Sequence, residues 1–149
     1  MHFEYDETTV RLQGEVARFL EEEISPAEPV LEEQLRANPD QWGPQPIVRE
    51  LQVKARERGL WNLFHPGEGG AGLTNLQYAP LAELSGRSLK LAPAAMNCAA
   101  PDTGNMAVLD EFGTSEQKKR WLAPLLDATI RSAFCMTEPD VASSDATNI

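Results

Sequence analysis

The residues best suited to chemistry stand at the end of the sequence, where hydroxyl groups gather among small side chains. Residues 134–149 read Phe-Cys-Met-Thr-Glu-Pro-Asp-Val-Ala-Ser-Ser-Asp-Ala-Thr-Asn-Ile. The hydroxyls of Thr137, Ser143 and Ser144 can donate hydrogen bonds, and the alanines beside them leave room for a ligand to approach the backbone. Such a loop suits a large, polar, anionic cofactor. The same composition is also typical of an ordinary turn whose side chains bond their own backbone.

A glycine-rich stretch at residues 65–72 matches the letters of the dinucleotide-binding fingerprint. Gly67, Gly69 and Gly72 have the spacing G-x-G-x-x-G. The fingerprint works between a parallel strand and its crossover helix, with an acidic residue about 20 positions later, and neither condition is met here. The stretch also lacks the Gly-Lys-Ser/Thr of a phosphate-binding loop. We therefore interpret it as a connection between helices.

The histidines and cysteines form no metal or disulfide pattern. His2 and His65 are the only histidines, and the sequence near them offers no partner ligands, so we expect no metal site and place both on the surface or in loops. Cys98 and Cys135 lie far apart, which indicates no disulfide framework. Because no histidine accompanies Cys135, we expect a small buried side chain there rather than a nucleophile.

Composition and charge narrow the class of protein. With 42% hydrophobic and 24% charged residues, the 149-residue chain is typical of a globular domain with its own core. Thirteen basic against twenty-three acidic residues give a formal charge of −10, which argues against nucleic acid or an anionic membrane as partner. The first residues are acidic and no run reaches transmembrane length, so we expect no signal peptide and no membrane insertion. A cytoplasmic location follows, or a mitochondrial or peroxisomal one if the parent protein is eukaryotic.

Hydrophobic residues recur at helical spacing as far as Asp127. Thr74 with Gln77, and Thr114 with Gln117, have the spacing of a capping box and mark two helix starts. The expected helices cover residues 7–24, 30–38, 46–59, 74–86, 102–112 and 114–127.

Two prolines fall between the first two of these helical patterns, and two more fall inside later ones. We expect Pro26 and Pro29 to interrupt the first pattern, because proline lacks an N–H and clashes with the preceding turn. Pro80 and Pro124 are expected to kink or divide their helices for the same reason.

The pattern changes after Asp127, where residues 131–136 form a compact apolar run that predicts a strand. The sequence therefore predicts an all-α helical bundle that ends in one β-strand and a loop of a truncated β-domain. We divide it into residues 1–130, the helical domain, and residues 131–149, the start of the second domain. The polar junction at residues 97–105 is interpreted as a helix start capped by Asp102 or Thr103.

The loop Thr137-Glu138-Pro139, followed by small residues and a Ser-Asp pair, resembles the flavin loop of the acyl-CoA dehydrogenases. It is one residue longer than the commonest version, and the string TEPDVASSDATN is similar to one branch of the family. The helix order, the glycine-rich turn, the Gly-Thr-Ser-Glu-Gln-Lys helix start and Trp-Leu-Ala-Pro-Leu-Leu follow the family in register. The resemblance implies an N-terminal helical domain with the first strand and flavin loop of the middle domain, and a C-terminal half beyond Ile149.

The same resemblance assigns roles to individual residues. It implies that FAD lies against Phe134, Cys135, Met136, Thr137, Glu138, Ser143 and Ser144. Ser144 would also lie near the pantetheine arm of the substrate, and Asn97 and Thr103 near its acyl chain. Glu138 is expected to hold the loop's shape, because the family's catalytic base is a carboxylate of the C-terminal domain. We therefore expect no catalytic residue within this chain, and no activity from it alone.

The implied reaction removes hydrogen from the α- and β-carbons of an acyl-CoA, giving a trans-2-enoyl-CoA and passing hydride to FAD. The implied partners are acyl-CoA, an electron-transfer flavoprotein or similar acceptor, and further copies of the complete chain in a homo-oligomer. Two alternatives stay open at this point. One is a non-catalytic acidic helical module that binds another protein, and the other is part of a related acyl-CoA oxidase.

Overall fold

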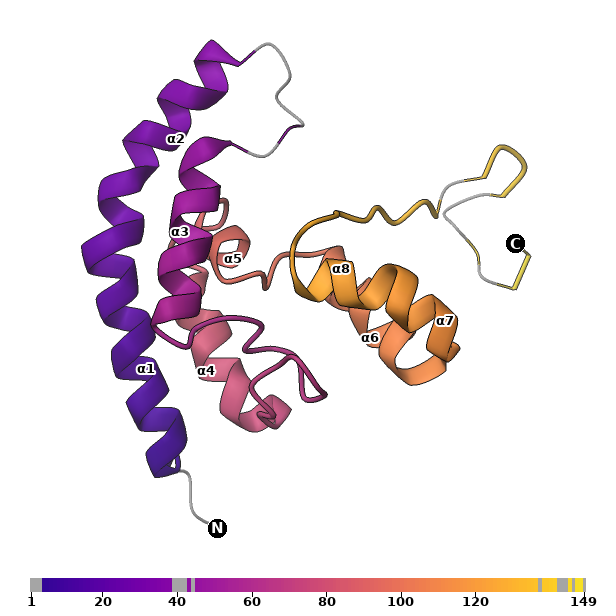
Figure 1. Cartoon of the computed structure of the whole chain (residues 1–149), viewed down its shortest axis with the longest axis horizontal. Coiled ribbons are helices and arrows are strands. Elements are labelled where there is room, and N and C mark those ends of the chain that lie inside the picture. Colours follow the sequence, from indigo (N-terminus) through magenta and orange to yellow (C-terminus); the bar gives the residue numbers. More distant parts are fainter. Residues whose placement is uncertain are drawn as a thin grey trace.

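The computed structural model describes residues 4–38, 43, 45–136, 138–141, 145, 147 and 148, and the helices in them form two groups (Figure 1). The main bundle contains α1 (Glu7–Phe19), the π-helix η1 (Leu20–Ile24), α2 (Ser25–Ala37), α3 (Pro46–Glu57), α4 (Asn75–Ser85) and α5 (Ala92–Ala95). The second group contains α6 (Asp102–Phe112), α7 (Ser115–Gln117), the π-helix η2 (Lys118–Leu122) and α8 (Ala123–Leu126). The expected all-α bundle is confirmed.

The elements α1, η1 and α2 join into one long rod along the side of the bundle (Figure 1), so the expected interruption at Pro26 and Pro29 is wrong. A proline ring inside an α-helix clashes with the carbonyl four residues earlier. Here the π-helical turn comes just before Pro26, and the Ser25 N–H donates to the Leu20 carbonyl across the wider turn. The Ser25 hydroxyl donates to the same oxygen at 2.9 Å. The wider turn lets the rod continue past the proline.

The prolines of the other helices do not divide them either. The helix expected from Thr114 runs without a break through α7, η2 and α8, and its π-helical turn ends shortly before Pro124, as η1 does before Pro26. Pro80 does not split its helix, since α4 runs through it from Asn75 to Ser85. Both capping boxes are confirmed, with the side chains of Thr74 and Thr114 each accepting from the backbone N–H three residues on.

The main bundle is built on apolar packing. Helix α1 packs on α4, and α3 packs on α5. The largest fully buried apolar side chains of this core are Phe19, Ile24, Leu51, Leu60, Leu63, Leu81 and Leu91. Because burial of each such side chain contributes about 1.5–3 kcal/mol, the hydrophobic effect accounts for most of this bundle's stability.

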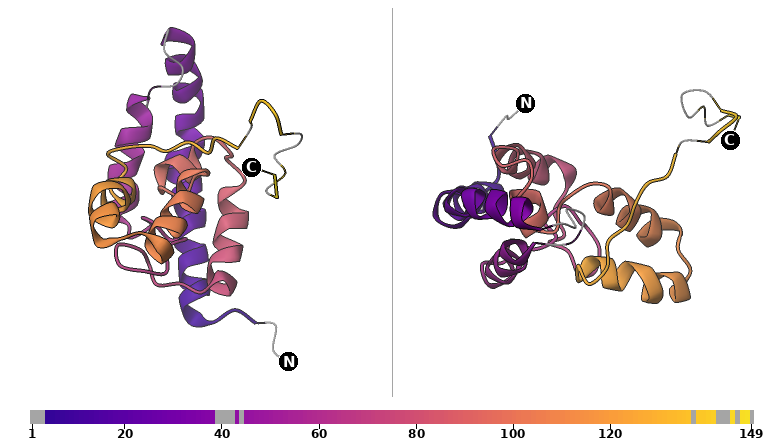
Figure 2. Two further views of the ribbon diagram at one scale, coloured as in Figure 1. Left: turned by 90° about the vertical axis from the view of Figure 1, so that its right-hand side faces the viewer. Right: turned by 90° about the horizontal axis from the view of Figure 1, so that it is seen from above.

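The second group lies beside the main bundle and has a much smaller core (Figure 2). Helix α6 packs against η2 and α8. Among the described residues, the buried apolar side chains of this cluster are Met106, Leu122 and Leu125, with Phe64, Leu109, Leu126 and Ile130 partly buried against them. So small a core leaves the position of α6 to α8 dependent on contacts with the main bundle.

After Ile130 the chain carries no further helix; it first contacts α6, and its end then extends away from both groups (Figures 1 and 2). The described residues contain no strand, and residues 131–136 carry no regular secondary structure. A strand exists only as a partner in a hydrogen-bonded ladder, and no neighbouring strand is described here. The strand at residues 131–136 and the domain boundary before it stay predictions.

Candidate functional site

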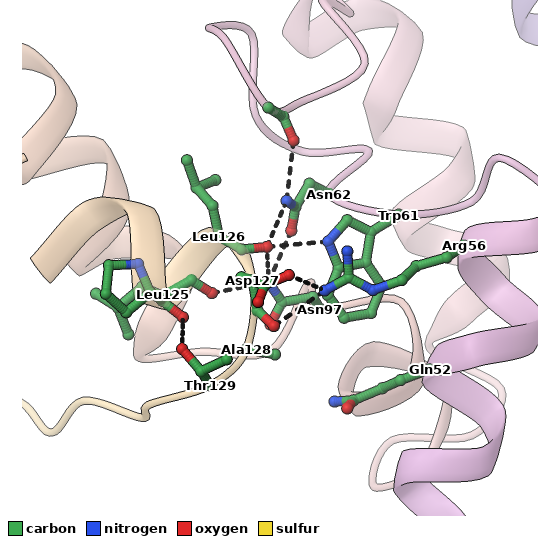
Figure 3. Close-up of polar contacts among 12 residues, drawn as sticks. Gln52, Arg56, Trp61, Asn62, Asn97, Leu125, Leu126, Asp127, Ala128 and Thr129 are labelled. Atoms are coloured by element: carbon green, nitrogen blue, oxygen red, sulfur yellow. Dashed lines mark hydrogen bonds and ion pairs between the residues drawn. The ribbon is translucent and has the colours of Figure 1, made fainter. Parts of the chain in front are cut away.

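The carboxyl end of α8 is held by side chains of the main bundle (Figure 3). The last carbonyls of any helix have no partner within that helix. The Leu126 carbonyl accepts from the Trp61 indole N–H and from the Asn62 amide, each at 2.9 Å. The Leu125 carbonyl accepts from the Asn97 amide at 3.1 Å. Three bundle side chains thus satisfy the end of a helix that belongs to the second group.

Two arginines of α3 add positive charge at the same helix end. Arg56 donates to the carbonyl and the carboxylate of Asp127, at 2.9 and 2.8 Å, while its guanidinium stacks 3.7 Å from the centre of the Trp61 ring. Arg49 donates to the Ala128 carbonyl at 2.9 Å. A cation is favourable at a helix carboxyl end, where the helix dipole is negative. Figure 3 shows the Arg56, Asn62, Trp61 and Asn97 side chains converging there.

Asn62 and Asn97 form the buried centre of this anchor. Both have left-handed backbones, with φ of 52° and 55°, which asparagine tolerates better than most residues. The Asn97 amide donates to the Asn62 side-chain oxygen at 2.7 Å, and the Asn62 amide donates to the Gly69 carbonyl at 2.9 Å. The pair therefore ties the second group to the glycine-rich loop.

The chain that leaves α8 is held again by Asp102, the first residue of α6. One oxygen of its carboxylate accepts from the Ser132 backbone N–H at 2.8 Å and from the Ser132 hydroxyl at 2.5 Å. The other accepts from the Arg131 guanidinium at 2.8 Å. The expectation that Asp102 or Thr103 caps this helix is wrong, because Pro101 is the N-cap residue and the Asp102 side chain bonds to residues 131 and 132 instead.

The described flavin-loop residues follow directly after this contact. Phe134 and Met136 are 66% and 46% exposed, and Cys135 and Glu138 are also exposed. The expectation that Cys135 is buried is wrong, because no packed element covers it in the described part of the chain. Thr137, Ser143 and Ser144 lie outside the described residues.

The residues that are described fit part of a flavin. Two exposed apolar side chains, Phe134 and Met136, offer a surface for a planar aromatic ring, and a flavin needs such a surface. Further along, the Asp145 carboxylate accepts from the Thr147 N–H and hydroxyl, at 3.0 and 2.7 Å, and these bonds lower the pKa of Asp145. That end of the loop forms the ordinary side-chain turn that was the alternative interpretation.

An open cavity of about 760 Å³ lies between α4, α6 and residues 64–66. Thr103 lines it, together with Phe64, Tyr78, Cys98, Ala100 and Ala107. Burial raises the pKa of the Tyr78 hydroxyl and of the Cys98 thiol, so both stay neutral near pH 7. The cavity wall is therefore uncharged at Tyr78 and Cys98, whereas Asp110 and Glu111 of α6, which also line the cavity, carry carboxylates.

His65 lies in the wall of this cavity; it stands in a loop, as one of the two expected placements had it, but it is buried and not on the surface. The residue is 1% exposed, and its Nε2 lies 3.7 Å from a carboxylate oxygen of Asp110. The glycine-rich loop folds back over it, with the Gly72 N–H donating to the His65 carbonyl at 3.3 Å. A Cβ at Gly70 would lie 2.0 Å from that carbonyl oxygen, which explains a glycine there. The stretch connects α3 to α4, as expected.

The family model described as "Acyl-CoA dehydrogenase, N-terminal domain" matches residues 6–129, which include both helical groups and the anchor of α8. The chain belongs to the acyl-CoA dehydrogenase family. The matched range ends before the loop, whereas the match to FadE2, described next, covers the whole chain.

Proteins similar in sequence or structure to this chain are also named as acyl-CoA dehydrogenases or as members of that family. FadE2 of Mycobacterium tuberculosis, named a probable acyl-CoA dehydrogenase, is 51% identical over 150 residues, which cover 100% of this chain and 36% of FadE2. Human acyl-CoA dehydrogenase family member 11 is 50% identical over 137 residues, covering 90% of this chain and 17% of that protein. A solved structure from Mycobacterium abscessus, assigned as an acyl-CoA dehydrogenase, has a TM-score of 0.88 and 50% identity, covering 98% of this chain and 38% of its own.

The chain thus corresponds to the N-terminal portion of acyl-CoA dehydrogenases and spans little more than a third of FadE2. No helix among the residues that the structure describes is long and apolar enough to cross a membrane.

The two residues expected near the acyl chain are placed differently. Thr103 lines the cavity, whereas Asn97 is 1% exposed and uses its amide to hold Asn62 and α8. The substrate role of both stays a prediction. Sequence reasoning missed Asp102 as a contact of the loop, and it missed Trp61, Asn62 and Arg56 as anchors of α8. Their partners lie between 29 and 71 residues away in the chain, beyond the reach of any local pattern.

Proposed function

We propose that this chain is the N-terminal part of an FAD-dependent enzyme that converts an acyl-CoA to a trans-2-enoyl-CoA. The observation that carries the proposal is the 51% identity to FadE2 across the whole chain, including the Thr-Glu-Pro loop. When bound, FAD would supply the acceptor for the hydride that leaves the β-carbon. The α-proton would pass to a carboxylate beyond Ile149, so the 149-residue chain alone is inactive.

The loop residues would hold the flavin in the proposed enzyme. Phe134, Cys135 and Met136 would lie along the ring, and the Thr137 hydroxyl with neighbouring backbone N–H groups would donate to its polar edge. Such donors stabilise the negative charge that develops as the ring accepts electrons. Ser143 or Ser144 would donate to the FAD pyrophosphate, and Ser144 also to the pantetheine arm. Glu138 would keep the loop in shape.

The cavity beside α6 would receive the acyl chain. The part of its wall formed by Phe64, Tyr78, Cys98 and Thr103 is apolar or neutral and suits a hydrocarbon, and Asp110 and Glu111 also line the cavity. Asn97 would influence this pocket indirectly, because its side-chain amide holds α8 and the Asn62 side chain in place. We propose that the complete protein is a cytoplasmic homo-oligomer that passes electrons to an electron-transfer flavoprotein or a similar acceptor.

The test uses the complete polypeptide that contains residues 1–149, purified and analysed for bound FAD and for enoyl-CoA formation with an artificial electron acceptor. We expect one FAD per chain and an enoyl-CoA product. Thr137→Val, which removes only the hydroxyl, is expected to lower kcat by at least about tenfold, as loss of a single preorganised donor does. Thr137→Ser is the matched control and is expected to retain most of the activity.

The alternatives give different results in the same experiment. An acyl-CoA oxidase would use molecular oxygen as acceptor and release hydrogen peroxide at the rate of product formation. A non-catalytic interaction module would contain no FAD and form no enoyl-CoA, and that result would overturn the proposal.

A further inference from the structure

We infer that Asp102 is a positioning residue for the cofactor loop: its nearly buried carboxylate fixes the direction in which residues 134–136 leave the helical domain. The inference rests on the proposed function, because it concerns the flavin-facing loop. It assigns Asp102 no contact with FAD or substrate.

The Asp102 carboxylate is built into the fold rather than exposed on it. The residue is 5% exposed, and both of its side-chain oxygens accept hydrogen bonds from the departing chain. The donors come from two consecutive residues, Arg131 and Ser132, and one of them is the Ser132 backbone N–H. A bond to the backbone fixes the path of the main chain itself, which a bond between two side chains does not.

A second residue of α6 supports the same point. Asn105 lies three positions after Asp102, so the two side chains share one face of the helix. Its amide donates to the Ser132 hydroxyl at 2.8 Å, and that hydroxyl donates to Asp102 at 2.5 Å. Ser132 is thus held by two helix residues and through both its backbone and its side chain.

The segment between α8 and the loop is therefore fixed at two places. Bundle side chains hold Leu125 to Ala128, and α6 holds Arg131 and Ser132. Phe134 follows two residues after the second contact, a span of roughly 7 Å in extended chain. A change of direction at Ser132 is carried into every proposed flavin contact that follows. Displacement of a positioned group by about 1 Å can cost up to about 100-fold in rate.

The experiment compares Asp102→Asn with the unchanged complete polypeptide. Asparagine keeps the size and an acceptor oxygen but loses the charge that pairs with Arg131. We expect FAD to remain bound, the visible absorption band of the flavin to shift, and kcat to fall by at least about tenfold with a smaller change in KM. Amide hydrogen exchange is expected to quicken in residues 131–136 and to stay unchanged in the main bundle.

Two further variants keep the test informative if Asp102→Asn does not fold. Arg131→Gln and Ser132→Ala remove donors from the loop side, leave α6 intact, and are expected to give the same spectral shift in weaker form. Glu23→Gln is the matched control, since it breaks a carboxylate–arginine contact of 2.8 Å in the main bundle. It is expected to change neither the flavin spectrum nor kcat.

The outcomes separate this inference from the proposed function. If the unchanged protein binds no FAD, the proposed function and the inference both fail. If it binds FAD and turns over acyl-CoA, but Asp102→Asn and both loop-side variants leave the flavin spectrum, kcat and exchange of residues 131–136 unchanged, only the inference is overturned.

Discussion

The two helical groups of this chain are stabilised in different ways. The main bundle buries large apolar side chains such as Phe19 and Leu51, whereas the second group buries few and depends on hydrogen bonds from the bundle to the end of α8. The hydrophobic effect is non-directional, whereas hydrogen bonds to a helix end fix its position within a few tenths of an ångström. The group that lies next to the loop is thus the one whose position is set by directional contacts.

The largest effect is expected from truncating a large side chain in the apolar core of the main bundle. Phe19 is 0% exposed, and Phe19→Ala leaves a cavity among side chains of the bundle. We expect the free energy of unfolding to fall by about 3–5 kcal/mol. Urea denaturation followed by circular dichroism measures it, and the whole helical signal is expected to be lost in one transition at lower urea. A change below 1 kcal/mol would mean that the bundle is not stabilised by this core.

A smaller and more local effect is expected from the polar anchor. Asn97→Ala removes the side-chain amide that donates to the Leu125 carbonyl and to the Asn62 side-chain oxygen. Both buried oxygens then lose this hydrogen bond. We expect a loss of roughly 1–3 kcal/mol, with faster amide exchange in α7, η2 and α8 than in α1.

Asn97→Gly separates the two contributions of that residue. Glycine accepts the φ of 55° without strain but has no side-chain amide to donate. If the hydrogen bonds hold α8, Asn97→Gly loosens α8 as Asn97→Ala does. If amide exchange of α8 in Asn97→Gly is as slow as in the unchanged protein, the backbone conformation of residue 97 alone matters. That result would contradict the contrast between the two groups.

The capping box of α7 is expected to contribute less. Thr114→Ala removes the acceptor for the Gln117 N–H, which costs about 1 kcal/mol at a typical N-cap. Thr74→Ala makes the matched change at the start of α4. Because α7 lies in the weakly packed group, we expect Thr114→Ala to speed amide hydrogen exchange in α7. Thr74→Ala is expected only to lower the global melting temperature. Equal local opening in both would remove the distinction.

The smallest effect is a pH dependence within the main bundle. The hydrogen bond from Lys54, with charge from Lys54 and Arg58, lowers the pKa of Glu23. A carboxyl group with a lowered pKa contributes its stability above the unfolded value of about 4.3, and loses it as the pH falls through the folded value. Glu23→Gln is expected to lower stability at neutral pH by less than about 1 kcal/mol and to flatten the acid side of the stability curve. An unchanged acid limb would mean that this ion pair is not formed in solution.

The sequence predicts what depends on neighbours along the chain. The capping boxes at Thr74 and Thr114 each need a glutamine three residues on, and both are confirmed. The prolines show the limit of such rules. The rule that proline ends a helix assumes a regular α-helix, and the π-helical turn before Pro26 removes the clash without leaving a mark in the sequence.

The candidate site shows the same limit more strongly. Asp102 has the residue type of a helix cap, yet its carboxylate meets Arg131 and Ser132, 29 and 30 residues later. His65 is buried because the glycine-rich loop returns over it, and no periodic pattern signals that return. The flavin loop was predicted by resemblance, and not by its composition, which fits an ordinary turn equally well.

The most direct test of the central claim is anaerobic titration of the complete polypeptide with acyl-CoA while the visible absorption of the flavin is followed. The account predicts a flavoprotein whose absorption band is bleached in proportion to the acyl-CoA added, with trans-2-enoyl-CoA recovered as the product. A protein that carries no flavin, or a flavin that no acyl-CoA bleaches, would contradict it.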